Sequence, residues 1–301
     1  HNNKTNFKFI IMGKLLDDIM NEFVSQYGDD FNSVDKMNSK MEQFMTQYNN
    51  IGCDDFEGYS PTEMTDIFYP TFSIGEIIQL KECSSDVYNE CPLFRQIKYV
   101  ISVLQRDGKI KLTAKGALPV KLVKELYPLG ASEFLVEKGI TKLNKETDSI
   151  ATQLTHFVLK QMKIVKEVHG VMTIVKGRAK MLEDDYAIMK LMLHVMTNLI
   201  NFAYFDRMQE VIGVIGIGFS IILIHKYGDE ERDATFYSTK YFKAFFPGVD
   251  DHDVYWIRVL ERCLRQLGLI TYKGYRYGVP PSIQKTDLFD KLIAVTPPNS
   301  K

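Results

Sequence analysis

Two segments of this chain, both within Pro92–Leu182, follow the same local pattern. In each, an amphipathic helical stretch is followed by a short β-prone run, a Lys-Gly pair and a new apolar-periodic stretch. The pairs are Lys115-Gly116 and Lys176-Gly177. Glycine permits backbone angles that other residues resist, so we interpret both pairs as turns of small β-hairpins rather than as phosphate loops. The pattern predicts a mainly α fold with small β-hairpins.

A third segment of this kind lies near the end of the chain. Apolar residues at helical spacing run from Val254 to Leu267, and Gly268 ends the expected helix. The following run predicts a tight hairpin around Lys273-Gly274, and a last helix is expected from about Lys285 to Ala294.

The remaining helices are predicted from apolar periodicity and capping residues. Ser60-Pro61-Thr62-Glu63 has the residues of a capping box with proline at the first helical position. A helical hairpin is expected from 7–27 and 34–48. Further helices are expected at 93–106, 118–126, 150–165, 186–205 and 211–227.

Length and composition are those of an ordinary globular protein. The 301 residues suffice for about two domains. Four cysteines, none in a CxxC pair, favour free thiols and a cytoplasmic location. The most apolar run, Val211–Ile224, is shorter than the roughly 20 residues that span a bilayer. We therefore expect no membrane partner.

Charge is unevenly distributed along the chain. Residues 1–90 carry 6 Lys/Arg against 16 Asp/Glu, a net charge of −10. Residues 93–127 carry 8 against 2, or +6, and residues 159–180 carry 6 against 1, or +5. Residues 258–276 carry 5 against 1, or +4. Positive charge therefore collects around the three hairpin segments, which suggests a surface for a polyanion.

The hairpin segments resemble winged-helix domains, in which a helix leads into a β-wing. Leu112-Thr-Ala-Lys-Gly116 matches the wing pattern, Thr173-Ile-Val-Lys-Gly177 matches it less well, and Leu267-Gly-Leu-Ile270 resembles the start of a further wing. The resemblance implies a helix that enters the major groove of DNA and a wing that contacts the backbone. Winged helices also serve as protein-docking modules, and a fold does not fix a function.

A narrower resemblance rests on Tyr59-Ser-Pro61, Lys111–Pro119 and Asn201–Asp206. These segments are similar to a group of uncharacterised bacterial proteins that often accompany a SEC-C zinc motif or occur as mobile-element passenger genes. The SEC-C cysteines are absent here, so the resemblance implies no zinc site. It would cover about 59–295.

If the chain binds nucleic acid, the lysines and arginines of the hairpin segments are the candidates for phosphate contacts. The candidate residues are Lys109, Lys111, Lys115, Lys121, Lys124, Lys176, Arg178, Lys273 and Arg276. The same segments add a second set, namely Lys160, Lys163, Lys166, Lys180, Arg258, Arg262 and Arg265, together with Tyr272, Tyr275 and Tyr277. The alternative interpretation is that these side chains form ordinary solvated helix faces.

Other motifs favour structural roles. Asp250-Asp-His-Asp253 and Asp184-Asp185 each precede a predicted helix, where acidic residues cap and favour the dipole, so a metal site is the lesser alternative. Gly213, Gly216 and Gly218 do not form a dinucleotide fingerprint, and we interpret them as small residues for close helix packing. We expect no catalytic residues, no metal and no cofactor.

The sequence therefore predicts an N-terminal helical region, 1–58, a tandem winged-helix-like region, 59–182, and a helical region with a C-terminal winged-helix-like unit, 183–301. The first hypothesis is a non-enzymatic DNA-binding or regulatory protein. The second is a protein-interaction module in which the acidic N-terminal region pairs with the basic units or with a partner. An enzyme ranks third.

Overall fold

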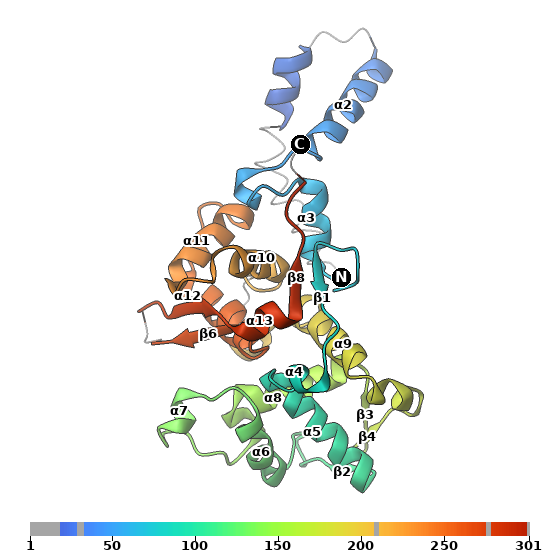
Figure 1. Cartoon of the computed structure of the whole chain (residues 1–301), viewed down its shortest axis with the longest axis vertical. Coiled ribbons are helices and arrows are strands. Elements are labelled where there is room, and N and C mark those ends of the chain that lie inside the picture. Colours follow the sequence, from blue (N-terminus) through green and yellow to red (C-terminus); the bar gives the residue numbers. More distant parts are fainter. Residues whose placement is uncertain (1–18, 29–32, 208–210, 275–277, 300–301) are drawn as a thin grey trace. The chain divides into compact units, whose positions relative to one another are not determined.

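A computed structural model describes residues 19–28, 33–207, 211–274 and 278–299. The fold is mainly α with small antiparallel sheets (Figure 1). The chain forms two compact units. Unit 1 comprises His1–Asp66, Thr239–Asp250 and Pro297–Lys301, and unit 2 comprises Ile67–Ser238 and Asp251–Thr296. The three domains expected from the sequence stay a prediction.

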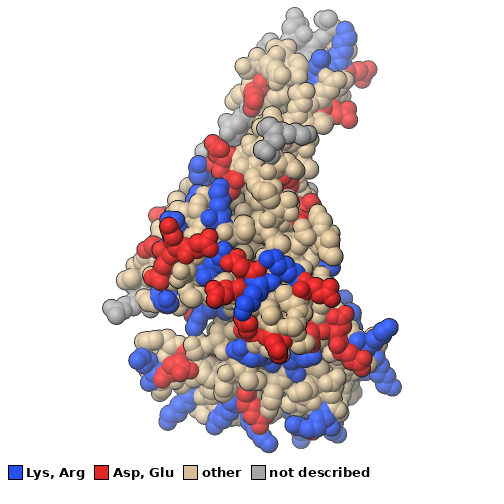
Figure 2. All heavy atoms as spheres, in the orientation of Figure 1, with Lys and Arg blue, Asp and Glu red and all other residues tan. Residues whose placement is uncertain are grey.

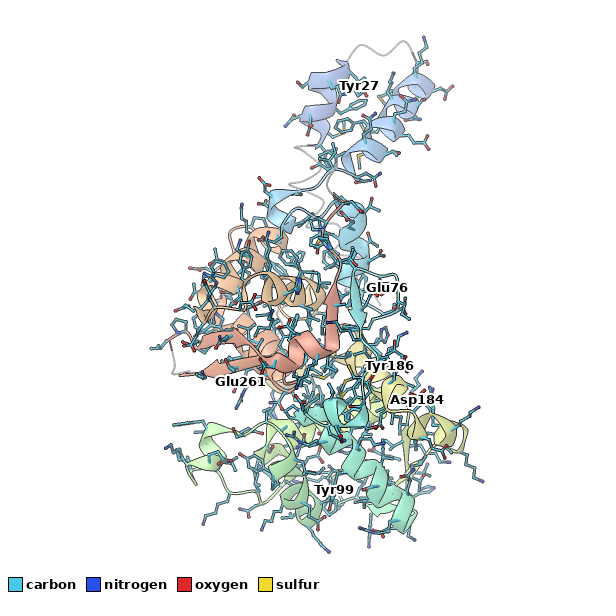
Figure 3. All side chains as sticks on the ribbon, viewed as in Figure 1. Tyr27, Glu76, Tyr99, Asp184, Tyr186 and Glu261 are labelled. Carbon is cyan, nitrogen blue, oxygen red and sulfur yellow. The ribbon has the colours of Figure 1, made fainter. Side chains whose placement is uncertain are left out.

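Unit 1 contains a helix over 19–27 and α2 (Val34–Tyr48). Ser33 caps α2 by accepting a hydrogen bond from the Lys36 amide at 3.3 Å. The two helices share a small apolar core in which Phe23 and Phe44 are buried, and Tyr27 packs against that core (Figure 3). Both predicted helices are confirmed within the described residues, and the expected residues 7–18 lie outside them.

The predicted capping box begins α3 (Pro61–Phe68). The Ser60 amide donates to Glu63 Oε2 at 2.8 Å, and the Glu63 amide donates to Ser60 Oγ at 3.3 Å. Nearby in unit 1, Glu57 pairs with Lys240 at 2.7 Å. Lys240 belongs to α11 (Ala234–Phe245).

Unit 2 contains a three-stranded sheet in the order β2-β4-β3. Ile110 of β2 pairs with Met172 of β4, and Val171 of β4 pairs with Val168 of β3. The two Lys-Gly segments therefore contribute strands to one sheet instead of forming a hairpin each. The elements of this part are α5 (Pro92–Asp107), β2 (Ile110–Lys111), α6 (Val120–Leu126), η2 (Tyr127–Leu129), α7 (Phe134–Glu137), η3 (Glu146–Asp148), α8 (Ile150–Gln161), β3 (Val165–Val168), β4 (Val171–Ile174) and η4 (Lys176–Glu183).

The second three-stranded sheet of unit 2 has the corresponding order, β5-β7-β6. In both sheets the third strand along the chain lies between the first and the second, and a helix precedes each first strand. The elements here are α10 (Ile217–Tyr227), β5 (Arg232–Asp233), α11, α12 (His252–Tyr255), the π-helix η6 (Trp256–Arg265), β6 (Ile270–Lys273) and β7 (Ser282–Lys285).

A two-stranded sheet pairs β1 with β8, and Gln79 lies opposite Ala294. The helix α9 begins at Asp185, and Asp184, its cap, accepts a hydrogen bond from the Ala187 amide at 2.9 Å, as predicted (Figure 3). The remaining elements are η1 (Asp54–Phe56) of unit 1 and, in unit 2, β1 (Ile78–Leu80), α4 (Ser85–Tyr88), α9 (Asp185–Asn198), η5 (Phe202–Phe205), α13 (Asp287–Leu292) and β8 (Ile293–Val295).

The interpretation of Lys176-Gly177 as a hairpin turn is wrong. The turn between β3 and β4 lies at His169-Gly170, where both residues adopt a left-handed backbone. Gly177 has no positive φ and lies in η4, the helix that follows β4. Gly116, in contrast, has a φ of 75°, as expected. The sequence pattern places the turn too late because it assigns the turn to the Lys-Gly pair, whereas the β-prone run is already interrupted at His169-Gly170.

The expected tight hairpin at Lys273-Gly274 is also wrong. Lys273 pairs with Ser282, so the connection is longer, and residues 275–277 fall outside the described part. The β7 strand occupies the start of the expected last helix.

The helix predicted to reach Phe205 ends earlier, at Asn198. Asn201 begins η5 instead, because its side chain accepts from the Ala203 amide at 3.0 Å.

The apolar run 211–227 is helical only from Ile217. Gly213 and Gly216 adopt left-handed φ values of 78° and 76°, which prevent an earlier start. Close packing is confirmed at Gly218, because a Cβ atom there would overlap the carbonyl oxygen of Ile67.

Candidate nucleic-acid interface

The short strand β2 presents alternating faces. Ile110 is buried, whereas Lys109 and Lys111 are exposed on either side of it. Strand alternation explains this arrangement because successive side chains point to opposite faces. The two lysines that sequence analysis proposed here are therefore available at the surface.

A further lysine shares the outer face of this sheet. Lys111 lies opposite Val171, and Lys166 of β3 lies opposite Thr173. Val171 and Thr173 are two residues apart on β4, so their side chains point to the same side. Lys111 and Lys166 therefore flank β4 on one face of the sheet.

The turn and helix after β2 carry the other candidates. Lys115 is exposed beside Gly116, and α6 exposes Lys121 and Lys124 while it buries Leu122. Figure 2 shows Lys and Arg side chains along the lower edge of the view, over α5, β2 and α6 of Figure 1. Figure 2 also shows acidic side chains between them.

The exposed lysines on and beside β2 make no ion pair with any described residue, a property that Lys142, Lys163 and Lys176 of unit 2 share. In the described part of the chain, no carboxylate lies within ion-pair distance of five exposed lysines. The five are Lys109, Lys111, Lys115, Lys121 and Lys124. Lys273, by comparison, is exposed but pairs with Glu231 at 3.4 Å, and Arg276 lies outside the described residues.

The two candidates after β4 lie on η4. Lys176 is exposed, whereas Arg178 is half-buried and its Nη1 lies 3.8 Å from the sulfur of Met181. They are separated by the length of β4 from the observed turn at His169-Gly170.

The arginines of the third basic group are buried or half-buried and already bound within unit 2, which corrects their interpretation as exposed phosphate ligands. Arg258 is fully buried and forms two hydrogen bonds with Asp206, at 2.9 and 2.8 Å. Arg262 binds the same carboxylate at 2.7 Å. Arg265 donates to the carbonyl oxygen of Ser132. These arginines hold the interior of unit 2 together.

The outward face of α8 is partly covered. Most of the helix is buried, and its accessible stripe contains Phe157 and Lys160. The ring of Phe157 packs against Tyr204 and Phe205, with centroids 5.6 and 5.9 Å away. The helix before the β3-β4 hairpin is therefore not a bare helical face.

A buried histidine lies between two carboxylates, and no sequence motif indicated it. His156 Nδ1 lies 2.9 Å from Glu146, and its Nε2 contacts Glu167. Lys160, one turn further along α8, pairs with Glu167 at 2.8 Å. Ionised carboxylates only accept hydrogen bonds, so a protonated ring that donates from both nitrogens satisfies this arrangement.

The electrostatics agree with that assignment. Burial disfavours the charged ring, but the hydrogen bonds and charges of Glu146 and Glu167 outweigh it and raise the pKa of His156. Burial by itself would raise the pKa of Glu167, but the bonds from Lys160 and His156 lower it below its ordinary value. The cluster joins η3, α8 and β3.

Among the described residues, no group of three His, Cys, Asp or Glu side chains is arranged to hold a metal ion. Asp251 occupies the cap position of α12 but makes no capping hydrogen bond through its side chain, and the nearby His252 Nδ1 lies 2.6 Å from Ser238 Oγ. All four cysteines are free thiols.

Comparisons with known proteins cover one part of the chain. Residues 89–187 match a family model described as the Y4jL N-terminal domain. This range contains α5, the β2-β4-β3 sheet and the start of α9. No curated protein and no solved structure matches the chain. Within the described residues, no helix has both the length and the apolar character needed to cross a bilayer.

Proposed function

We propose that the β2-β4-β3 part of unit 2 is a winged-helix-like unit that binds the phosphate backbone of nucleic acid. The observation that carries this proposal is the set of five exposed lysines on and beside β2 that have no carboxylate partner in the described chain. The order of elements supports the winged-helix part, because α8 leads directly into the β3-β4 hairpin. Lysines without partners lose no ion pair when they bind phosphate.

The expected mode of binding does not depend on base sequence. A recognition helix must present its side chains to the base edges in the major groove. The rings of Tyr204 and Phe205 cover Phe157 on the outward stripe of α8, which obstructs that entry. Lysine contacts to phosphate position a protein but carry no sequence information. We therefore expect similar affinities for duplexes of different sequence.

The proposal is tested by duplex DNA binding across a range of salt concentrations. The triple variant Lys109→Ala, Lys111→Ala and Lys115→Ala is expected to weaken binding for every duplex tested. Each phosphate contact contributes a slope of about 0.9 to log K against log salt, so the slope should become shallower by up to about 3. Fluorescence anisotropy with a labelled duplex provides the measurement.

A matched control removes the same charge from elsewhere in unit 2. Lys138, Lys142 and Lys145 are exposed on the segment around α7, and their triple replacement by alanine should change the salt slope much less. If wild-type protein fails to bind duplex DNA at low salt, or if both triple variants bind alike, the lysine surface is not the interface.

A second candidate function, self-association, is favoured by the segment around α7. Phe134, Leu135 and Ile140 are 70%, 51% and 69% exposed, and α7 has no buried residue. The segment is nevertheless anchored, because Glu133 accepts hydrogen bonds from the Ser149 hydroxyl at 2.6 Å and from the first amides of α8. Exposed apolar groups held in place mark interaction surfaces. The acidic N-terminal region of a second copy would complement the charge of Lys138, Lys142 and Lys145, the exposed lysines around α7.

Light scattering after size exclusion at low salt tests this candidate. Wild-type protein is expected to form a dimer, and the double variant Phe134→Ser with Ile140→Ser is expected to be a monomer. Val168→Ser is the control, since Val168 is 52% exposed on β3, away from this segment in the chain. A strictly monomeric wild-type protein contradicts self-association and leaves the nucleic-acid proposal intact.

A further inference from the structure

Three aromatic rings of unit 2 form a partly exposed shelf, which we define as Phe157, Tyr204 and Phe205. Their centroids lie 5.6 to 5.9 Å apart, and the planes of Tyr204 and Phe205 are nearly perpendicular. Phe157 and Phe205 are half-buried, but Tyr204 remains 65% exposed. The two inner rings therefore support an outer ring that is open to solvent.

The segment that carries Tyr204 is fixed at both ends of η5. Phe202 is fully buried and packs against Phe205, with the two ring centroids 6.4 Å apart. On the other side, Asp206 is held by Arg258 and Arg262. An exposed tyrosine on such a fixed segment does not lose much conformational freedom when a ligand packs against it.

Basic residues lie close to the shelf residues in the sequence. Arg207 follows η5 and is exposed, with a left-handed φ of 63°. Lys163 is exposed just after α8, and Lys160, one helical turn beyond Phe157, is exposed but pairs with Glu167 at 2.8 Å. The neighbouring negative charge of Asp206 is compensated by its two arginines. Aromatic rings beside exposed cations form the arrangement that single-stranded nucleic acids require, since the rings stack on bases and the cations contact phosphates.

We propose that this shelf stacks an unpaired base of single-stranded nucleic acid, with Tyr204 as the ring in contact. The inference rests on the proposed function and narrows its ligand to strands with accessible bases. A duplex would have to extrude a nucleotide to reach the shelf, which requires a base to be unpaired and unstacked. A single strand has no such requirement. The lysines of β2 and α6 would bind the backbone of either form.

The test compares a labelled 12-nucleotide oligothymidine with a duplex of equal length in anisotropy titrations of the full chain. Tyr204→Ala is expected to weaken single-strand binding about 5- to 150-fold, the range that one stacked base accounts for, and to leave duplex binding unchanged. Tyr204→Trp should retain single-strand affinity, and its added indole emission should be quenched by the oligothymidine.

Tyr69→Ala is the matched control, because Tyr69 is a 45% exposed tyrosine elsewhere in unit 2. Equal effects of the Tyr204 and Tyr69 variants on single-strand binding would overturn the shelf proposal. If duplex binding still depends on the β2 lysines in that case, the proposed function stands without the shelf. If wild-type protein binds neither oligonucleotide, both proposals fail together and the self-association candidate takes their place.

Discussion

Asp206→Ala is expected to lower the free energy of unfolding of unit 2 by about 3–5 kcal/mol, the usual cost of removing one partner from a buried ion pair. Arg258 is fully buried, and it binds both oxygens of Asp206. Its Nη1 also donates to the carbonyl oxygen of Ile212 at 3.0 Å. Without the carboxylate, the buried guanidinium loses its opposite charge and cannot regain water, so the folded state carries the desolvation cost.

Urea unfolding followed by tryptophan emission measures this change. Trp256, the single tryptophan of the chain, lies in η6 two residues before Arg258, so its signal reports on this part of unit 2. Asp107→Ala is the control. Asp107 forms a similar two-bonded pair with Arg106, but both side chains are largely exposed.

Because water screens the exposed pair, Asp107→Ala should change the free energy of unfolding far less than Asp206→Ala does. If the two aspartate variants have equal stabilities, the Asp206 pairs do not hold η5 against η6. If Asp206→Ala keeps wild-type stability, the Asp206 pairs do not fix the segment that carries Tyr204, and the shelf loses that support.

Local signals in the sequence predicted the parts of the fold that depend on neighbouring residues. The Ser60–Glu63 capping box and the Asp184 cap are both present in the structure. Each depends only on hydrogen bonds between a side chain and a backbone amide three residues away, so the local sequence is enough to predict it. Strand pairing was not predictable in the same way. The partner of Ile110 is Met172, more than sixty residues later, and nothing in either short strand specifies the other.

The candidate site was predictable only in part, for a related reason. A lysine beside a turn glycine, such as Lys115, commonly lies at the surface, so its exposure could be predicted from the sequence. Arg258 and Arg262 look like the same class of residue in sequence. Their carboxylate partner is about fifty residues earlier, and burial of an arginine cannot be inferred without knowing that partner. Tyr204 was part of a noted motif, but its exposure depends on the tertiary packing of η5.

His156→Gln is expected to destabilise unit 2 by about 3 kcal/mol at mildly acidic pH, since it removes the cation between two carboxylates. A glutamine side chain is neutral and cannot donate to Glu146 and Glu167 as the imidazolium does. The effect is expected at mildly acidic pH because the pKa of His156 is raised in the folded protein, which keeps the ring charged there. A raised pKa contributes stability that is fully present below the unfolded value of about 6.5 and is lost as the pH rises through the folded value.

Glu167 contributes to the pH dependence of the unfolding free energy with the opposite sign. Its lowered pKa adds stability above the unfolded value of about 4.3, and this stability is lost as the pH falls through the folded value. The difference in unfolding free energy between wild type and His156→Gln should therefore be largest between about pH 4.3 and pH 6.5, and should shrink at higher pH. Urea titrations at several pH values measure it.

Histidine NMR titration gives an independent check on the same cluster. His225 provides the internal control, because burial and the positive charge of Lys285 lower its pKa. The two histidines should therefore titrate on opposite sides of about pH 6.5, with His156 the higher. A stability difference that stays constant from about pH 6 to pH 9, or a His156 resonance that titrates below that of His225, would show that Glu146 and Glu167 do not share a charged ring.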